Sequence, residues 1–202
     1  MTAAPMTEGD MIAALHARYG AAHGNGPRYA VAGGVKSHAG HSSPRTADFI
    51  AMDLWVSGGL EIHGHEVKVS RSDWLRELKE PEKAAEFIPY VNRWWLVVPD
   101  PVIVGLGELP DGWGLMAMRG GRLAVIERAP KRDALALPPT RLAALLRAVA
   151  GTAMNQRDRH HERVFHSHRR TDCGTRWAGC CCTPAGGQTE TAVAAGNQKG
   201  SR

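Results

Sequence analysis

The 202-residue sequence predicts an α/β domain with a mixed sheet, in the order helix, strand, strand, strand, helix, strand. Three observations lead to this fold class. A helix-capping signature near the N-terminus precedes apolar residues at helical spacing. Three runs rich in strand-forming residues follow, separated by glycine-rich turns. A second capping signature then starts another helix, and the strongly apolar run RWWLVVP comes after it.

The first half of the chain contains one helix and three strands. Thr7 and Asp10 form a capping box before MIAALHARY, which predicts a helix over residues 8–19. The runs RYAVAGGV, RTADFIAMDLWV and LEIHGHEVKVS predict strands at residues 28–35, 45–56 and 60–70. Because only a short turn separates the second and third strands, we expect them to pair as an antiparallel hairpin.

The second half adds a helix, a buried strand, a hairpin and a closing helix. Ser70 and Asp73 form an S-x-x-D cap, so a helix begins there and continues to about residue 90, with a break at Pro81. RWWLVVP predicts a buried strand at residues 93–99. The apolar runs on either side of RGG predict an added hairpin, and PPTRLAALLRAVAG predicts a closing C-terminal helix.

Charge and composition divide the chain near Gly151. Residues 152–202 hold eight Lys and Arg against four Asp and Glu, so the net charge of +5 arises mostly there. This segment has few large aliphatic residues, which predicts a disordered basic tail after a folded domain at residues 1–151. A zinc site in the tail is the alternative, but three consecutive cysteines do not readily face one ion. All the cysteines lie in this tail: Cys173, Cys180, Cys181 and Cys182.

Composition also excludes several classes of protein. No apolar run approaches the roughly 18 residues that a membrane span requires. The N-terminus has no basic region followed by an apolar one, as a signal peptide would. Residues 1–151 contain no cysteine, so no disulfide framework holds the domain together. We therefore expect a cytoplasmic protein.

The stretch HGHEVKVS carries the clearest sign of chemistry. Glu66 and Lys68 are two residues apart in a predicted strand, so they share a face, and Val67 and Val69 share the other. Asp48 lies on the strand that pairs with it. Two neighbouring carboxylates repel each other, and a divalent cation relieves the repulsion. Mg²⁺ (or Mn²⁺) typically binds one or two carboxylates and several waters, often with a backbone carbonyl, here that of Val67.

The segments RTADFIAMDLW, HGHEVKVSRSDWLRELKEPEKA, RWWLVVPD and LPDGWGLM together resemble the PD-(D/E)XK nuclease-like superfamily. More narrowly, they resemble its MmcB-like DNA-repair group and related phage and actinobacterial proteins. The resemblance covers about residues 8–128. It implies a restriction-endonuclease-like core and Mg²⁺-dependent cleavage or binding of DNA, in repair, restriction or phage metabolism.

The resemblance also implies roles for individual residues. Asp48 matches the family's metal-binding acid, and Glu66 and Lys68 match its E-x-K pair. Asp48 and Glu66 would then hold the metal and Lys68 would assist the attacking water. A supporting segment follows at the start of the next helix: Ser70, Arg71 and Asp73. Family members often take another acid from the first helix, and here Glu8 and Asp10, both at its start, are the candidates.

Other interpretations of these residues stay open at this point. Glu66 and Lys68 could form an exposed ion pair on a strand. His63 and His65 could bind zinc, but no third ligand is evident. Asp53 is expected to be a solvated strand end. Trp94 and Trp95 could stack on unpaired bases, or one could be a core residue and the other a partly exposed neighbour.

Two functions other than cleavage fit the same residues. One is a catalytically inactive module of the same fold that binds nucleic acid. The other is a structural protein in which the E-x-K pair takes part in neither DNA cleavage nor nucleic-acid binding. The sequence does not fix the oligomeric state, although a homodimer would let a single-domain nuclease cut both strands.

Overall fold

The computed structural model describes residues 5–20, 22–23, 26–39, 45–80 and 82–170. The helices are α1 (Glu8–Tyr19), α2 (Arg71–Lys79), α3 (Glu82–Ala85) and α4 (Pro139–Arg170), with single turns of 3₁₀ helix at Val56–Gly58, Ile88–Tyr90 and Pro101–Ile103. A two-stranded ribbon is formed by β1 (Ala22–His23) and β2 (Gly26–Pro27). The main sheet contains β3 (Tyr29–Lys36), β4 (Thr46–Asp53), β5 (Ile62–Val67), β6 (Arg93–Val98), β7 (Trp113–Arg119) and β8 (Arg122–Glu127).

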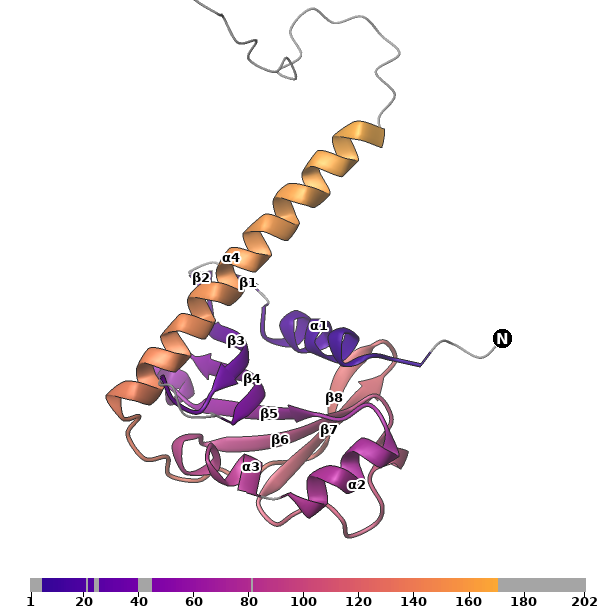
Figure 1. Ribbon diagram of the computed structural model, residues 1–202, viewed down its shortest axis with the longest axis vertical. Helices are drawn as coiled ribbons and strands as arrows, with labels where there is room; N and C mark the ends of the chain where they lie inside the picture. The colour runs from indigo at the N-terminus through magenta and orange to yellow at the C-terminus, as the bar shows by residue number, and fades with distance from the viewer. Residues whose placement is uncertain (1–4, 21, 24–25, 40–44, 81, 171–202) are drawn as a thin grey trace, which may run out of the picture. The chain divides into compact units, whose positions relative to one another are not determined.

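The main sheet is mixed, with its six strands in sequence order from β3 to β8. The pairs β3–β4, β4–β5 and β7–β8 are antiparallel, whereas β5–β6 and β6–β7 are parallel (Figure 1). The predicted α/β class and the order α–β–β–β–α–β are therefore confirmed, as are the added hairpin and the C-terminal helix. In this topology the carboxyl ends of β5, β6 and β7 lie at one edge of the sheet.

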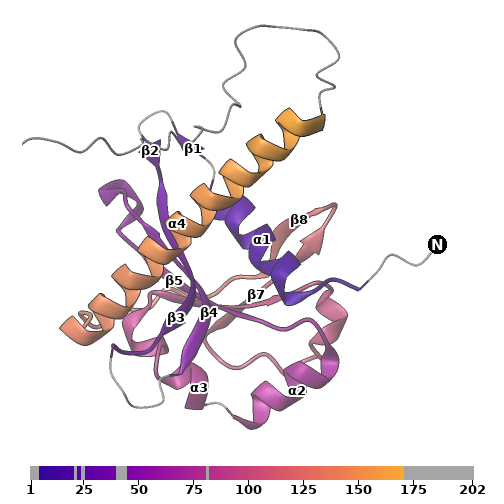
Figure 2. The same ribbon diagram turned by 45° about the horizontal axis from the view of Figure 1, so that its top comes forward.

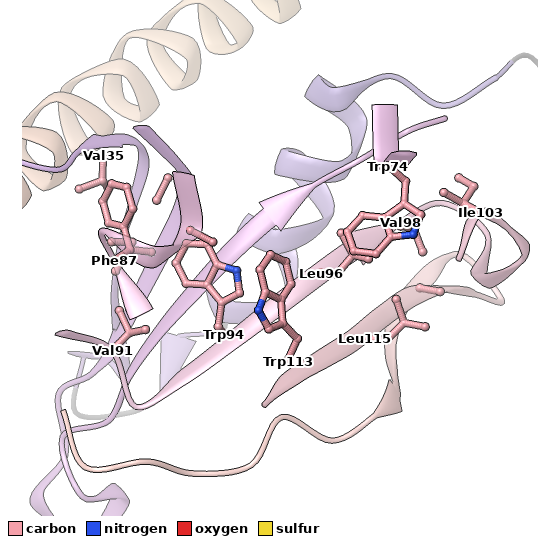
Figure 3. Close-up of a cluster of buried hydrophobic side chains, with 14 of the residues drawn as sticks. Val35, Trp74, Phe87, Val91, Trp94, Leu96, Val98, Ile103, Trp113 and Leu115 are labelled. Atoms are coloured by element: carbon pink, nitrogen blue, oxygen red, sulfur yellow. The ribbon is translucent and has the colours of Figure 1, made fainter. Parts of the chain in front are cut away.

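The two faces of the sheet bury different sets of side chains. Helix α1 packs on one face of the sheet (Figure 2). There Met11 and Leu15 belong to one buried cluster with Phe49, Val67 and Trp95. The other face packs against α2, α3 and the adjoining turns. Its core combines aromatic rings with aliphatic side chains (Figure 3). The rings of Trp94 and Trp113 are in edge-to-face contact at 5.9 Å, and the cluster also includes Trp74, Phe87, Leu96, Val98 and Leu115.

Both tryptophans of the Trp94–Trp95 pair are core residues. Trp94 is fully buried and Trp95 is 5 % exposed, and they occupy opposite faces of the sheet. The expectation of one partly exposed tryptophan is wrong, because β6 is a central strand covered on both faces. Neither ring is accessible for stacking on a base. Trp74, also fully buried, packs α2 onto the sheet.

Local signals account for where the two principal helices begin. The Thr7 side chain accepts a hydrogen bond from the Asp10 amide, and the Asp10 carboxylate accepts one from the Thr7 amide, which completes the predicted capping box. Ser70 caps α2 by accepting a hydrogen bond from the Asp73 amide. The helix predicted after Ser70 is divided as expected, because α2 ends at Lys79 and α3 begins at Glu82. It does not continue to residue 90 as predicted: α3 ends at Ala85, and a single 3₁₀ turn follows at Ile88–Tyr90.

Helix α4 is longer than predicted. It runs from Pro139 to Arg170, so residues 152–170 are helical and the boundary expected near Gly151 falls inside a helix. Adding residues to an existing helix avoids the cost of nucleation, so a polar segment can continue it. The rest of the predicted tail, with Cys173 and Cys180–Cys182, lies outside the described residues. Among those described, no helix has the length and apolarity that a bilayer span needs.

Candidate functional site

The candidate site lies where β5 ends, at the sheet edge shared with the end of β6. The register pairs Phe49 of β4 with His65 of β5, so continuing it by one residue brings Asp48 opposite Glu66. The two backbones do not pair there. Instead, Oδ2 of Asp48 accepts a hydrogen bond from the Val67 amide at 2.8 Å. The structure thus brings the predicted acid of β4 directly onto the E-x-K segment.

Lys68 lies between two acidic side chains. Its Nζ is 2.6 Å from Oε1 of Glu66 and 2.9 Å from Oε2 of Glu77, which comes from α2. Glu66 is 1 % exposed and Glu77 is 9 % exposed, so both carboxylates are buried. Burial by itself lowers the pKa of the Lys68 ammonium, but the charges of Glu66 and Glu77 outweigh it and hold that pKa above its ordinary value. The alternative of an exposed ion pair is therefore wrong.

Glu77 is the functional residue that the sequence analysis missed. It follows Ser70 by two turns of helix and lies on the same inward face of α2 as Trp74. A glutamate on the buried face of a helix needs a partner, and Lys68 is that partner. The signal was present in the sequence, because Trp74, Glu77 and Leu78 have the spacing of one helix face.

A cleft of about 330 Å³ opens beside Lys68 and Glu77. Its charged lining includes four acids and two bases, which gives a formal surplus of two negative charges: Glu8, Asp73, Glu77, Glu80, Lys68 and Arg76. Glu8 is the first residue of α1, so the first helix supplies an acid to the cleft. Asp10, the other candidate, is held in the capping box with Thr7, whose backbone amide lowers the pKa of the carboxyl.

The three supporting residues have structural partners. The Ser70 hydroxyl donates to Asp73 Oδ2 at 2.7 Å, in addition to capping α2. Arg71 binds Glu108 through both terminal nitrogens and also donates to the carbonyl of Ile103. The Arg71 guanidinium lowers the pKa of the Glu108 carboxyl to about 2. Arg71 therefore fastens the start of α2 to the loop between β6 and β7.

His63 and His65 lie on the face of β5 opposite Glu66, toward α1. The Nε2 atom of His65 is 2.9 Å from the hydroxyl of Tyr19, and the indole of Trp95 donates to Nδ1 of His63. Burial lowers the pKa of His65 to about 3 and that of His63 to about 4. In the described part of the chain, no group of three or more His, Cys, Asp or Glu side chains is arranged to hold a metal ion.

Asp53 has a different environment from the solvated strand end that the sequence predicted. It is 3 % exposed, accepts two hydrogen bonds from the guanidinium of Arg28, and accepts a third from the Trp55 amide. Hydrogen bonding to Arg28 lowers the pKa of its carboxyl. The expectation is wrong because Arg28, just before β3, reaches across the β3–β4 pair to neutralise it.

Comparisons with known proteins give a likeness of fold. No family model matches the sequence, and no curated protein matches it. Among solved structures, the chain is similar to a protein of unknown function from Silicibacter pomeroyi, with a TM-score of 0.47 and 19 % sequence identity; the match covers 77 % of this chain and 90 % of that one. Because that protein's function is not established, the chemistry of the site itself has to indicate a function.

Proposed function

We propose that the protein is a Mg²⁺-dependent nuclease that hydrolyses DNA phosphodiester bonds in repair, restriction or phage metabolism, in the cytoplasm. One observation carries the proposal. Asp48, Glu66 and Lys68, from two strands, converge where β5 ends beside an open cleft. This set of groups is the one that the resemblance to PD-(D/E)XK nucleases implies.

The donor set suits an open magnesium site. Within a strand, the N–H and C=O of one residue point to the same side, so the Val67 carbonyl faces the side on which Asp48 binds the Val67 amide. Asp48, Glu66 and that carbonyl together offer two carboxylates and one neutral oxygen, and Mg²⁺ needs no more from protein because it retains waters. A bound Mg²⁺ would lower the pKa of a water and offset charge on the phosphate.

Lys68 acts in this proposal as a fixed positive charge. Because its two carboxylate partners raise its pKa, it stays protonated at neutral pH and does not serve as a general base. Its ammonium can orient a water molecule and stabilise the negative charge that develops on a phosphate under attack. Glu77 is a positioning residue, because it holds Lys68 Nζ from the side of α2.

The surplus of acids in the cleft supports a requirement for a cation. A phosphodiester is an anion, and Glu8, Asp73, Glu77 and Glu80 would repel it from the cleft. A divalent ion between Asp48 and Glu66 would reverse that sign locally.

A second candidate is a nucleic-acid-binding module of the same fold without turnover. Two findings favour it. In the described residues no three acidic or histidine side chains form a metal cluster, and Lys68 is already bound by two acids. In this version the ion triad of Glu66, Lys68 and Glu77 is a structural link between β5 and α2.

The test is plasmid nicking by the full chain with Mg²⁺ or Mn²⁺, compared with Asp48→Asn and Glu66→Gln. Both substitutions keep an oxygen that can accept the observed hydrogen bonds while they remove the charge that would bind metal. We expect each to lower the nicking rate by roughly 100-fold, the usual effect of losing one preorganised group that stabilises charge in the transition state. Glu80→Gln, which neutralises an exposed acid in the same cleft, is the matched control and should not lower the rate.

Each result decides between the two candidates. Nicking that survives in Asp48→Asn and Glu66→Gln would show that these residues do not carry the activity. A complete lack of cleavage on plasmid, single-stranded and branched DNA would select the binding module. If cleavage occurs, direct linearisation of plasmid without a nicked intermediate would indicate a homodimer, and nicking alone would indicate one active site per duplex.

A further inference from the structure

The turn between β7 and β8 places two arginines directly opposite each other. Arg119 is the last residue of β7 and Arg122 the first of β8, and the sheet register pairs them across the turn residues Gly120 and Gly121. Like charges that face each other across two strands destabilise a hairpin. Within the part of the chain that the structure describes, no acidic side chain pairs with either arginine. The local sequence thus maintains an unfavourable charge pair at an exposed tip.

A third arginine reaches the same region from α1. Arg18 donates a hydrogen bond from Nη1 to the carbonyl of Leu123, which holds its guanidinium beside β8 at 2.9 Å. A hollow of about 470 Å³ lies between α1 and the hairpin, and both Arg18 and Arg122 line it. Figure 2 shows α1 and β8 side by side. The described lining contains no acid: Ala14, Ala17, Arg18, Gly121, Arg122 and Leu123.

This arginine hairpin and the acidic cleft lie at the same edge of the sheet. The register aligns Val67 of β5 with Val97 of β6, and Val97 with Met116 of β7. Two strand spacings therefore separate the end of β5 from β7, which is about 10 Å, and Arg119 lies three residues, or about 10 Å, beyond Met116. The arginines are thus on the order of 15 Å from the candidate metal site, the axial length of four to five DNA base pairs.

Three other arginines of the domain have acidic partners. Arg28 binds Asp53, Arg71 binds Glu108, and Arg93 binds Glu61. The charges of these three arginines are therefore paired within the domain. The guanidinium groups at the hairpin are instead presented to solvent beside a hollow, and a guanidinium matches a phosphate through paired N–H donors.

We propose that Arg18, Arg119 and Arg122 bind backbone phosphates of the DNA strand that enters the acidic cleft. This inference rests on the proposed function and assigns the substrate contact that the cleft, with its negative surplus, lacks. The glycines at positions 120 and 121 support close approach, because both have positive φ and open space where a Cβ would be. Backbone contacts of this kind carry affinity without sequence preference.

The experiment measures DNA binding by the full chain without divalent cations, so that cleavage does not interfere. A fluorescein-labelled 30-base-pair duplex is titrated with wild type, with Arg119→Gln/Arg122→Gln, and with the control Arg128→Gln/Arg147→Gln. The control removes the same net charge from exposed positions outside the hairpin tip. We expect the hairpin variant alone to lose affinity on the order of 50-fold at 0.1 M salt, with a salt slope smaller by about two.

Thermal melting and competition complete the test. Because the arginine pair is unfavourable within the fold, the hairpin variant should melt at the wild-type temperature or above it, which a structural role for the arginines would not produce. Poly-glutamate should displace the duplex far less effectively than unlabelled DNA does; equal displacement would indicate an acidic protein partner and overturn the inference.

The outcomes for this inference and for the nuclease proposal are separable. Equal affinity and salt slope in the hairpin variant and the control would overturn the arginine site even if the wild type cleaves DNA. Reduced affinity in the hairpin variant of a chain that never cleaves would support the arginine site and remove the nuclease proposal.

Discussion

The two faces of β5 bury polar side chains to the same depth in opposite ways. On one face His65 is fully buried, and on the other Glu66 is 1 % exposed. His65 stays neutral because it is buried against the rings of Tyr19 and Phe49. Glu61 lies 3.6 Å from Nε2 of His63 and raises the pKa of that ring, but the burial of His63 outweighs this charge. The glutamate face is ionic because the Lys68 ammonium forms ion pairs with both Glu66 and the α2 residue Glu77. The helix that packs on each face therefore decides whether the buried polar side chains of that face are neutral or charged.

The hydrogen bonds of His65 show how a buried ring remains neutral. Its Nδ1 is 3.3 Å from the carbonyl of Phe49, which only accepts, so Nδ1 carries the proton. Nε2 is then an acceptor, and the hydroxyl of Tyr19 donates to it at 2.9 Å. Burial raises the pKa of Tyr19, so this hydroxyl keeps its proton at any ordinary pH. Both ring nitrogens have partners without any charge.

The largest effect we predict is the loss of stability on removing the Lys68 ammonium. Lys68→Met leaves Glu66 and Glu77 as two buried carboxylates without their shared cation. Leaving a buried charge uncompensated costs about 3–5 kcal/mol of the free energy of unfolding. Urea denaturation of the full chain, followed by tryptophan fluorescence, measures this cost. For the same reason, Lys68 substitutions are a poor first test of cleavage.

Two controls sharpen this prediction. The triple variant Glu66→Gln/Lys68→Met/Glu77→Gln has no buried charge left in the triad, so it should regain most of the lost stability. Arg76→Met breaks the ion pair of Arg76 with Asp73 on the surface of the same helix and should cost less than about 1 kcal/mol. A loss for Lys68→Met as small as that for Arg76→Met would show that water, and not Lys68, solvates the two acids.

The histidine face predicts a pH dependence of stability. In the unfolded chain a histidine takes up a proton near pH 6.5, whereas His63 and His65 in the fold do so only near pH 4 and pH 3. Below pH 6.5 the unfolded state therefore binds more protons, and the free energy of unfolding falls as the pH falls. Each histidine contributes a slope of at most about 1.4 kcal/mol per pH unit.

The measurement is the free energy of unfolding at several values between pH 6.5 and pH 4.5, above the range in which most carboxylates titrate. His65→Gln should flatten the curve by up to one histidine's share of the slope, whatever its effect on stability at neutral pH. Parallel curves for wild type and His65→Gln would mean that His65 does not remain neutral within the fold.

The alternation along β5 could be predicted because it is a local property. Strand periodicity separates Val67 and Val69 from Glu66 and Lys68, and the structure confirms the two faces. The cap at Ser70 is equally local. Asp53 is the opposite case, because its burial depends on Arg28, 25 residues away in the chain. No local sequence pattern distinguishes an aspartate at a strand end that pairs with a distant arginine from one that is exposed to solvent.

The part of the candidate site that comes from two consecutive paired strands could be predicted from the sequence. The part that comes from a helix packed on the sheet was harder to predict. Asp48 and Glu66 belong to one hairpin, so their meeting follows from register. Glu77 joins them only because α2 packs its Trp74 face on the sheet, which depends on tertiary packing. The length of α4 was missed for another reason: few aliphatic residues indicate a segment without a core, but a continued helix does not require one.

The smallest effect we predict is the loss of stability on removing the N-cap of either helix that covers β5. Thr7 caps α1, which carries Tyr19 to the histidine face, and Ser70 caps α2, which carries Glu77 to the ionic face. Thr7→Ala and Ser70→Ala should each lower the free energy of unfolding by about 1 kcal/mol, because each leaves an amide at the helix start without its acceptor. Chemical denaturation of both variants measures this.

Plasmid nicking by the same pair then tests whether Ser70 has a role beyond capping. Its hydroxyl forms hydrogen bonds with Asp73 in α2, so Ser70 caps α2 as Thr7 caps α1. We expect the two variants to lose equal stability and to nick DNA, if the wild type does, at the same rate. A loss of nicking confined to Ser70→Ala would place the hydroxyl in the chemistry of the cleft, because its contribution to the helix is already matched by Thr7.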